Sequence, residues 1–159
     1  MSGQQEAPDG VPAGEVYDWF VRGLDLLEGG NAQAAAALLA HARSAEPASA
    51  SILEALARAT FDAGRYPEAH DLFRELVETT PDDDYARFGL GLSRLRVGDL
   101  PGAVEQLALA AAMRPTRAEY QRALREARAT LRAREMSSST GTGDPGDPGD
   151  SGAGEERPT

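Results

Sequence analysis

The stretch AGRYPEAHDLF, residues 63–73, places a glycine, an alanine and a large aromatic residue at spacings that recur on either side of it. When the sequence is shifted against itself by 34 residues, three columns of identical residues align: Gly30, Gly64 and Gly98; Ala35, Ala69 and Ala103; and Pro47, Pro81 and Pro115. Two further columns agree in character, with small residues at Gly23, Ala57 and Gly91 and large apolar residues at Leu39, Phe73 and Leu107. A constant period of this length indicates stacked copies of one short structural unit.

Each column has a physical role in a pair of packed helices. Small residues let two helices approach closely, so we expect Gly23 to face Ala35. A glycine at the end of a helix favours the left-handed backbone that terminates it. Asn31 and Asp99, which directly follow two of these glycines, can cap the next helix, whereas Arg65 is a weaker cap.

Residues 16–115 therefore resemble three copies of the tetratricopeptide repeat, a 34-residue unit of two antiparallel helices. Trp19 and Leu26 match large positions of the family in the first repeat. The resemblance implies an all-α fold, a short right-handed α-solenoid of antiparallel helix pairs, with repeats at about 16–47, 50–81 and 84–115. Arg22, Thr60 and Arg94 depart from the pattern, because the family has large apolar residues at these positions.

The segment after the third repeat predicts a seventh helix at 116–135 that caps the solenoid. It opens with TRAE, residues 116–119, a capping-box pattern, and carries an apolar stripe of Tyr120, Leu124 and Leu131. Five arginines flank the stripe: Arg122, Arg125, Arg128, Arg132 and Arg134. We expect them to form a solvated outer face. The alternative is a docking surface for an acidic partner or nucleic acid.

The two ends of the chain differ in composition from the repeats. Residues 1–13 and the acidic Gly/Pro/Ser/Asp-rich segment 136–159 hold too few large apolar residues to form a core, so we expect both to be disordered. The tetratricopeptide-like domain is then 14–135. The N-terminus lacks a signal-peptide pattern, and the apolar run AAAALLA is too short to cross a membrane. We therefore expect a cytoplasmic protein without membrane contact.

Composition excludes several kinds of chemistry. The chain has no cysteine, which excludes thiolate nucleophiles and cysteine-ligated metals, and its 16 basic residues are all arginine, which excludes a P-loop lysine. Arginine without lysine is typical of a GC-rich bacterial genome. His41 and His70, the two histidines, lie on different repeats without a metal-ligand spacing. We expect no enzyme activity, no catalytic residue, no metal and no cofactor.

The family resemblance implies a concave groove lined by the first helix of each repeat. Its columns carry Tyr17, Phe20, Leu24, Glu54, Arg58, Phe61, Tyr85, Phe88 and Leu92, which we interpret as partner-binding residues. Phe20 and Phe88 are the strongest candidates, since large aromatic residues dominate binding energy. Alternatively, the aromatic side chains bury one another, and Glu54 pairs with Arg58 four residues on. The family's Lys and Asn clamp for carboxylates is absent, because Phe20 and Leu24 stand there.

These features favour a non-catalytic protein–protein interaction module, an adaptor, scaffold or co-chaperone-like protein that binds a helix or peptide of another protein. One alternative is a self-associating homodimer formed through exposed aromatic residues. Another is weak binding of nucleic acid or an acidic partner by the arginine-rich helix. A net charge of −10 makes nucleic acid the least favoured partner.

Overall fold

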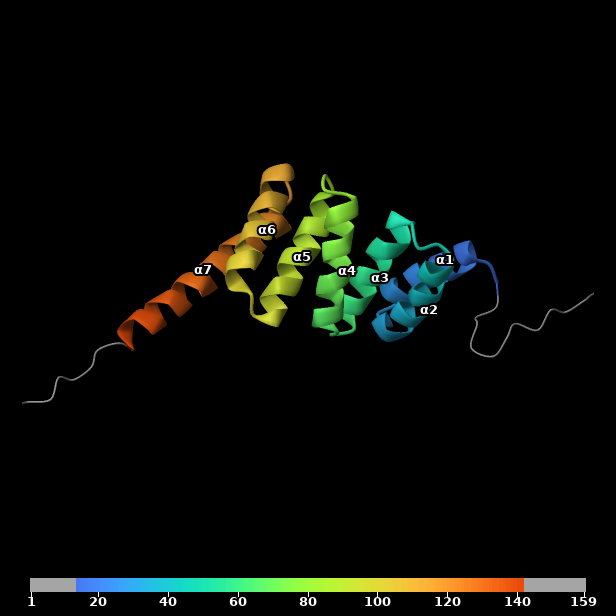
Figure 1. Ribbon diagram of the computed structural model, residues 1–159, viewed down its shortest axis with the longest axis horizontal. Coiled ribbons are helices and arrows are strands. Elements are labelled where there is room, and N and C mark those ends of the chain that lie inside the picture. The colour runs from blue at the N-terminus through green and yellow to red at the C-terminus, as the bar shows by residue number, and fades with distance from the viewer. Residues whose placement is uncertain (1–13, 142–159) are drawn as a thin grey trace, which may run out of the picture.

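The computed structural model describes residues 14–141 and forms an elongated row of seven helices (Figure 1). The helices are α1 (Val16–Glu28), α2 (Ala32–Ala45), α3 (Ala50–Asp62), α4 (Tyr66–Thr79), α5 (Asp84–Val97), α6 (Leu100–Met113) and α7 (Ala118–Thr140). Residues 14–141 contain no strand, and none of their helices is long and apolar enough to cross a membrane. The predicted all-α solenoid of seven helices is confirmed.

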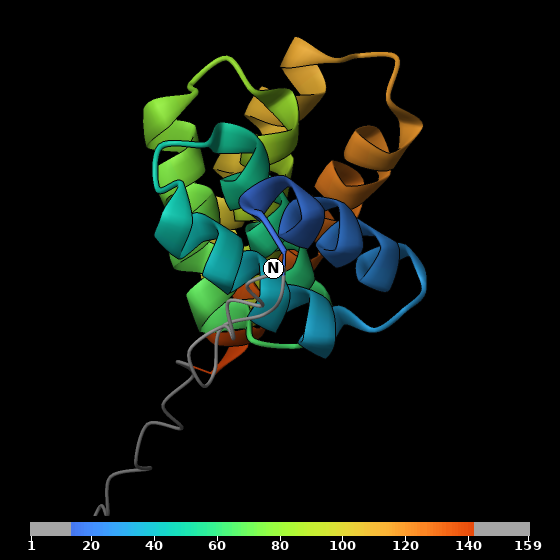
Figure 2. The same ribbon diagram turned by 90° about the vertical axis from the view of Figure 1, so that its right-hand side faces the viewer.

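The sequence period sets the helix boundaries. The first helices of the repeats and α7 begin at Val16, Ala50, Asp84 and Ala118, so each start lies 34 residues after the previous one. Every helix packs on its neighbours in the chain, and α1, α3, α5 and α7 also contact one another in series. Figure 2, which looks along the row from the α1 end, shows the helices stacked behind one another.

The turn between the two helices of each repeat depends on its glycine. Gly30, Gly64 and Gly98 have φ values of 82°, 81° and 89°, a left-handed backbone that other residues rarely adopt. The predicted caps are also present, since the side chain of Asn31 accepts from Ala34 N and that of Asp99 from Gly102 N. Arg65 makes no such hydrogen bond, as expected for a weak cap.

Small residues let the paired helices approach. A Cβ on Gly23 would lie 2.7 Å from two carbons of Leu39, and one on Gly91 would lie equally close to Leu107. Gly23 thus accommodates Leu39 on α2, one turn beyond the predicted partner Ala35, which is itself buried. In the first and third repeats, the large apolar residue of the second helix therefore packs on the glycine of the first helix.

The N-terminal end of the row explains why Arg22 departs from the family pattern. Asp18, Arg22 and Asp25 occupy the columns that hold the buried residues Ile52, Leu56 and Ala59 one repeat later. In the described structure no helix precedes α1, so this side of α1 faces solvent and its three charged side chains are exposed. These repeat positions therefore hold buried apolar residues inside the row and charged residues at its N-terminal end.

The start of α7 corrects one prediction. Arg117, not Thr116, is the N-cap of α7, and no side chain caps the helix there. Glu119 instead accepts a hydrogen bond from Arg117 Nη1 at 2.8 Å. The capping box predicted from TRAE is therefore wrong, because the glutamate is held by the adjacent guanidinium.

The end of α7 corrects a second prediction. The helix continues to Thr140, five residues beyond the predicted end at 135, so residues 136–140 are helical rather than disordered. The hydroxyls of Ser137, Ser138 and Thr140 donate to carbonyls four residues back, which satisfies them within the helix. The disorder predicted for 1–13 and 142–159 concerns residues outside the described range.

Candidate partner-binding groove

The first helices of the repeats bring seven of the nine predicted binding residues to two hollows rather than to one continuous groove. Arg58, Phe61, Tyr85, Phe88 and Leu92 line a pocket between α3 and α5. Tyr17 and Phe20 line a second hollow at the start of α1, whereas Leu24 packs, partly buried, on core residues that include Leu27 and Leu39. Glu54, on α3, lines neither hollow.

The pocket between α3 and α5 is small, and four of its eight lining residues are aromatic. Its volume is about 110 Å³ and, besides the five predicted residues, it is lined by Asp62, Phe73 and Gly89. Sequence interpretation missed these three. Asp62 and Gly89 directly follow the predicted groove residues Phe61 and Phe88, so the repeat alignment contained a signal for both. Phe73 belongs to the core column and carried no such signal.

Gly89 accommodates the buried ring of Phe73 at the pocket. A Cβ at this position would overlap three atoms of that ring, so only glycine lets α5 pass so close to the ring. Phe73 is 2% exposed and belongs to the core of the middle repeat. The pocket therefore reaches the hydrophobic core.

The other aromatic residues of the pocket each pack against a neighbour. Phe88 stacks on Tyr120 of α7, with ring centroids 4.5 Å apart and planes at 28°. Phe61 meets Tyr66 edge to face at 5.1 Å, and the Arg96 guanidinium lies over both rings. The alternative that these aromatic side chains bury one another thus holds in part, although the same residues line the pocket.

The polar rim of the pocket is weakly paired. Arg58 Nε lies 4.0 Å from Asp62 Oδ2, and both side chains are nearly half exposed. The alternative in which Arg58 pairs with Glu54 is wrong, since Asp62 is its ion-pair partner among the described residues. The hydroxyl of Tyr85 forms no hydrogen bond within residues 14–141, and burial raises the pKa of Tyr85.

Glu54 lies in an unfavourable place for a negative charge. Partial burial raises the pKa of the Glu54 carboxyl above its ordinary value. The negative charges of Asp83 and Asp84, at the start of α5, raise it further, while Arg58 acts in the opposite direction. This part of the groove therefore favours a proton or a positive group over a second anion.

The second hollow is larger than the aromatic pocket, and more of its lining residues are polar. It has a volume of about 240 Å³ and is lined by Val16, Tyr17, Phe20, Glu46, Ser49, Ser51 and Ile52. Tyr17 is 73% exposed, the largest exposed fraction of any large apolar side chain in residues 14–141. Tyr17 is on α1, whereas the aromatic pocket lies between α3 and α5, so Tyr17 offers a second apolar contact point.

The described residues hold no cluster of metal-ligating side chains, since no group of three or more His, Asp or Glu side chains among residues 14–141 could hold a metal ion. His41 is exposed on α2, and His70 Nδ1 lies 3.1 Å from Asp71 on the same helix.

Comparison with known proteins supports the fold. A family model described as tetratricopeptide repeat matches residues 20–84 and 55–118. No curated protein matches the chain. The first TPR domain of human RPAP3 is similar, with 18% identity, a TM-score of 0.70, and coverage of 77% of this chain and 96% of that one.

Two further solved structures show the same likeness. The first TPR of Spaghetti (RPAP3) bound to the HSP90 peptide SRMEEVD has 17% identity and a TM-score of 0.69, covering 78% of this chain and 98% of that one. MamA from Desulfovibrio magneticus RS-1 has 17% identity and a TM-score of 0.71, covering 80% and 72%. At these identities the likeness concerns the fold.

Proposed function

The chain belongs to the tetratricopeptide repeat family, and from that premise we propose that it is a non-catalytic interaction module whose groove binds a short segment of a partner protein. The aromatic pocket between α3 and α5 is the observation that carries this proposal. A concave site lined by apolar side chains, with a few polar groups at its rim, is typical of ligand binding.

The size of the pocket suits one apolar side chain of a partner. A volume of about 110 Å³ corresponds to roughly four water molecules at about 30 Å³ each. Moving an apolar side chain from water into contact with Phe61, Phe73 and Phe88 is favourable, because apolar surface leaves water on both partners. The pocket is thus proposed to hold the anchor residue of the bound segment.

The rim offers hydrogen bonds to the backbone beside that anchor. The Tyr85 hydroxyl has no hydrogen-bond partner within residues 14–141, and Arg58 is held only by Asp62 at 4.0 Å. Both are donors, so they suit carbonyl oxygens of a peptide. Tyr17, in the second hollow, then adds an apolar contact further along the segment.

A solved relative is consistent with this proposal. The Spaghetti domain holds a peptide of HSP90, so a domain of this fold binds a peptide. In this chain Phe20 and Leu24 occupy the positions of the family's carboxylate clamp, so we do not propose the same ligand. We expect the bound segment to be held by an apolar anchor residue rather than by a clamped carboxylate.

The test is selection of binding peptides from a random display library on the full chain, followed by calorimetric titration of the selected peptides. Selected peptides should share an apolar residue, and Arg58→Ala and Tyr17→Ala should each weaken binding about fivefold or more, which corresponds to about 1 kcal/mol. Neither substitution removes a core contact, because the Arg58 side chain is nearly half exposed and Tyr17 is 73% exposed.

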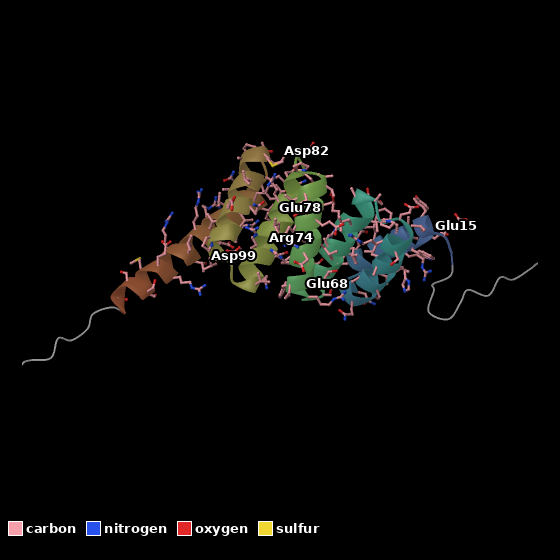
Figure 3. The ribbon with its side chains drawn as sticks, viewed as in Figure 1. Glu15, Glu68, Arg74, Glu78, Asp82 and Asp99 are labelled. Carbon is pink, nitrogen blue, oxygen red and sulfur yellow. The ribbon has the colours of Figure 1, made fainter. Side chains whose placement is uncertain are left out.

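Each variant has a matched control. Arg74 pairs with Asp71 at 3.9 Å, much as Arg58 pairs with Asp62, but lies on the surface of α4 (Figure 3). Met136 is 71% exposed on α7, nearly as much as Tyr17 on α1. Arg74→Ala and Met136→Ala should leave the affinity unchanged. If the groove variants bind as tightly as these controls, the segment binds elsewhere and the groove proposal fails.

A further inference from the structure

The arginines divide into two groups according to whether they have partners. Nine of those in residues 14–141 form an ion pair or donate a hydrogen bond: Arg43, Arg58, Arg65, Arg74, Arg87, Arg94, Arg96, Arg114 and Arg117. The other six make no such contact within that range: Arg22, Arg122, Arg125, Arg128, Arg132 and Arg134. Five of these six lie on α7.

Four of the five form one surface, here called the arginine face: Arg122, Arg125, Arg128 and Arg132. Their spacing of three, three and four residues keeps them on one side of α7, and all four are exposed. Arg125 stands in the column that holds the buried Gly23, Ala57 and Gly91 in the repeats. This side of α7 is therefore the side on which another helix would pack.

The acids of α7 do not neutralise this face. Glu119 is paired with Arg117 at the start of the helix. Glu126 and Glu135 form no ion pair within residues 14–141. Neighbouring like charges on a helix repel, so the arginine face favours any negative group that comes within reach.

The chain itself supplies such a group immediately after α7. Residues 142–159 contain five acids, Asp144, Asp147, Asp150, Glu155 and Glu156, and a single arginine. The first three acids are spaced by three residues. We propose that residues 144–156 fold back and bind the arginine face of α7 in the same molecule.

The length of chain suits this arrangement. Along α7, at about 1.5 Å per residue, Arg132, Arg128 and Arg122 lie about 12, 18 and 27 Å before Thr140. An extended chain at about 3.3 Å per residue carries Asp144, Asp147 and Asp150 about 13, 23 and 33 Å beyond Thr140. Asp144 lies within the reversal of direction, and Asp147 and Asp150 reach Arg132 and Arg128 with about 11 and 15 Å of chain left for that reversal.

Tethering makes such weak contacts effective. A single exposed ion pair contributes little, but the short connection holds the acids near the arginines at an effective concentration in the millimolar range. Salt weakens the contact, because the Debye length falls from about 30 Å at 0.01 M to about 3 Å at 1 M. The bound segment covers the arginine face, so an external polyanion that binds this face has to displace it.

The experiment uses paramagnetic broadening in the full chain. Ser151→Cys introduces the only cysteine, which carries a nitroxide label, and the amide signals of residues 122–132 are recorded by NMR. At low salt the label should reduce these intensities at least twofold. The intensities should recover at high salt and in the variant Asp144→Asn, Asp147→Asn, Asp150→Asn.

Two arginine variants complete the test. Arg125→Gln, Arg128→Gln, Arg132→Gln should abolish the broadening, and circular dichroism checks that α7 stays helical, as glutamine favours helices. Arg22→Gln, which removes the unpaired arginine at the far end of the row, should leave the broadening unchanged. Broadening that persists at high salt or in the charge variants reflects tethering alone and overturns the proposal.

A mixed sample identifies whose segment is bound. Isotope-labelled chains without nitroxide are combined with nitroxide-labelled chains without isotope. Broadening of residues 122–132 in this mixture would show that a second copy supplies the acids, and it overturns binding within one molecule. Heparin added to the single-chain sample should displace the segment and restore the signals, and failure to do so speaks against a shared site.

Discussion

The hydroxyl of Tyr120 donates a hydrogen bond of 2.8 Å to Asp84 Oδ2, which joins the capping helix α7 to the start of α5. The other carboxylate oxygen of Asp84 lies 3.2 Å from Arg114 Nε, so the carboxylate holds groups from both sides of the α6–α7 turn. The Tyr120 ring stacks on Phe88, which lines the aromatic pocket. The position of the pocket wall therefore depends on the docking of α7.

Tyr120→Phe should destabilise the protein by about 2 kcal/mol, because it removes a hydrogen bond to a charged acceptor. Tyr120→Ala should cost more, about 3–5 kcal/mol, since it also removes a buried ring. Urea unfolding measures both values. Tyr17→Phe, at an exposed tyrosine of α1, is the control and should be neutral. Equal stability of Tyr120→Phe and wild type would mean that the hydrogen bond contributes nothing.

Gly89→Ala should destabilise the protein by about 1–3 kcal/mol, although alanine favours helices, because the new methyl group overlaps the Phe73 ring. Gly141→Ala is the control, since the nearest atom to its added Cβ is 3.9 Å away. Adding Phe73→Leu should restore part of the loss in Gly89→Ala by making room. If the double variant is as unstable as the sum of the two single variants, the two residues do not compete for space.

The repeat alignment predicted the fold because each of its positions requires one type of residue, whatever that residue contacts. Gly30, Gly64 and Gly98 each follow a helix with a left-handed backbone, and the 34-residue spacing carries this information from one repeat to the next. The starts of the first helices of the three repeats followed directly from this. The end of α7 did not, because serine and threonine hydroxyls can bond either inside a helix or outside it.

The candidate site was predicted less completely because it depends on pairs of residues from different columns. Phe88 was identified as a groove residue, but its stacking on Tyr120 requires the capping helix, which lies outside the repeats. The partner of Arg58 depended on rotamers, and the structure places Asp62 there rather than Glu54. The repeat alignment therefore predicts which residues line the site but not which residues they contact.

Thr60→Val should stabilise the protein by about 1 kcal/mol. Thr60 is buried, and its hydroxyl has no hydrogen-bond partner in the described structure, so the side chain loses hydration without compensation. Valine has nearly the same shape and stands where the family has a large apolar residue. Thr79→Val is the control, because the Thr79 hydroxyl donates to Glu75 O, and it should be neutral or destabilising. A loss of thermal stability in Thr60→Val would show that its hydroxyl is bonded.

Glu54→Gln should stabilise the protein at neutral pH and have little effect under acidic conditions. Burial and the charges of Asp83 and Asp84 raise the pKa of Glu54 in the folded state above its value in the unfolded chain. Between these two pKa values the folded state binds more protons, so this group lowers stability as the pH rises through that window. The measurement is the melting temperature of the variant and of wild type from pH 4 to pH 7. Glu78→Gln, at an exposed glutamate of α4, corrects for the effect of losing one negative charge (Figure 3). A gap in melting temperature that stays constant with pH would show that the carboxylate is well solvated in the groove.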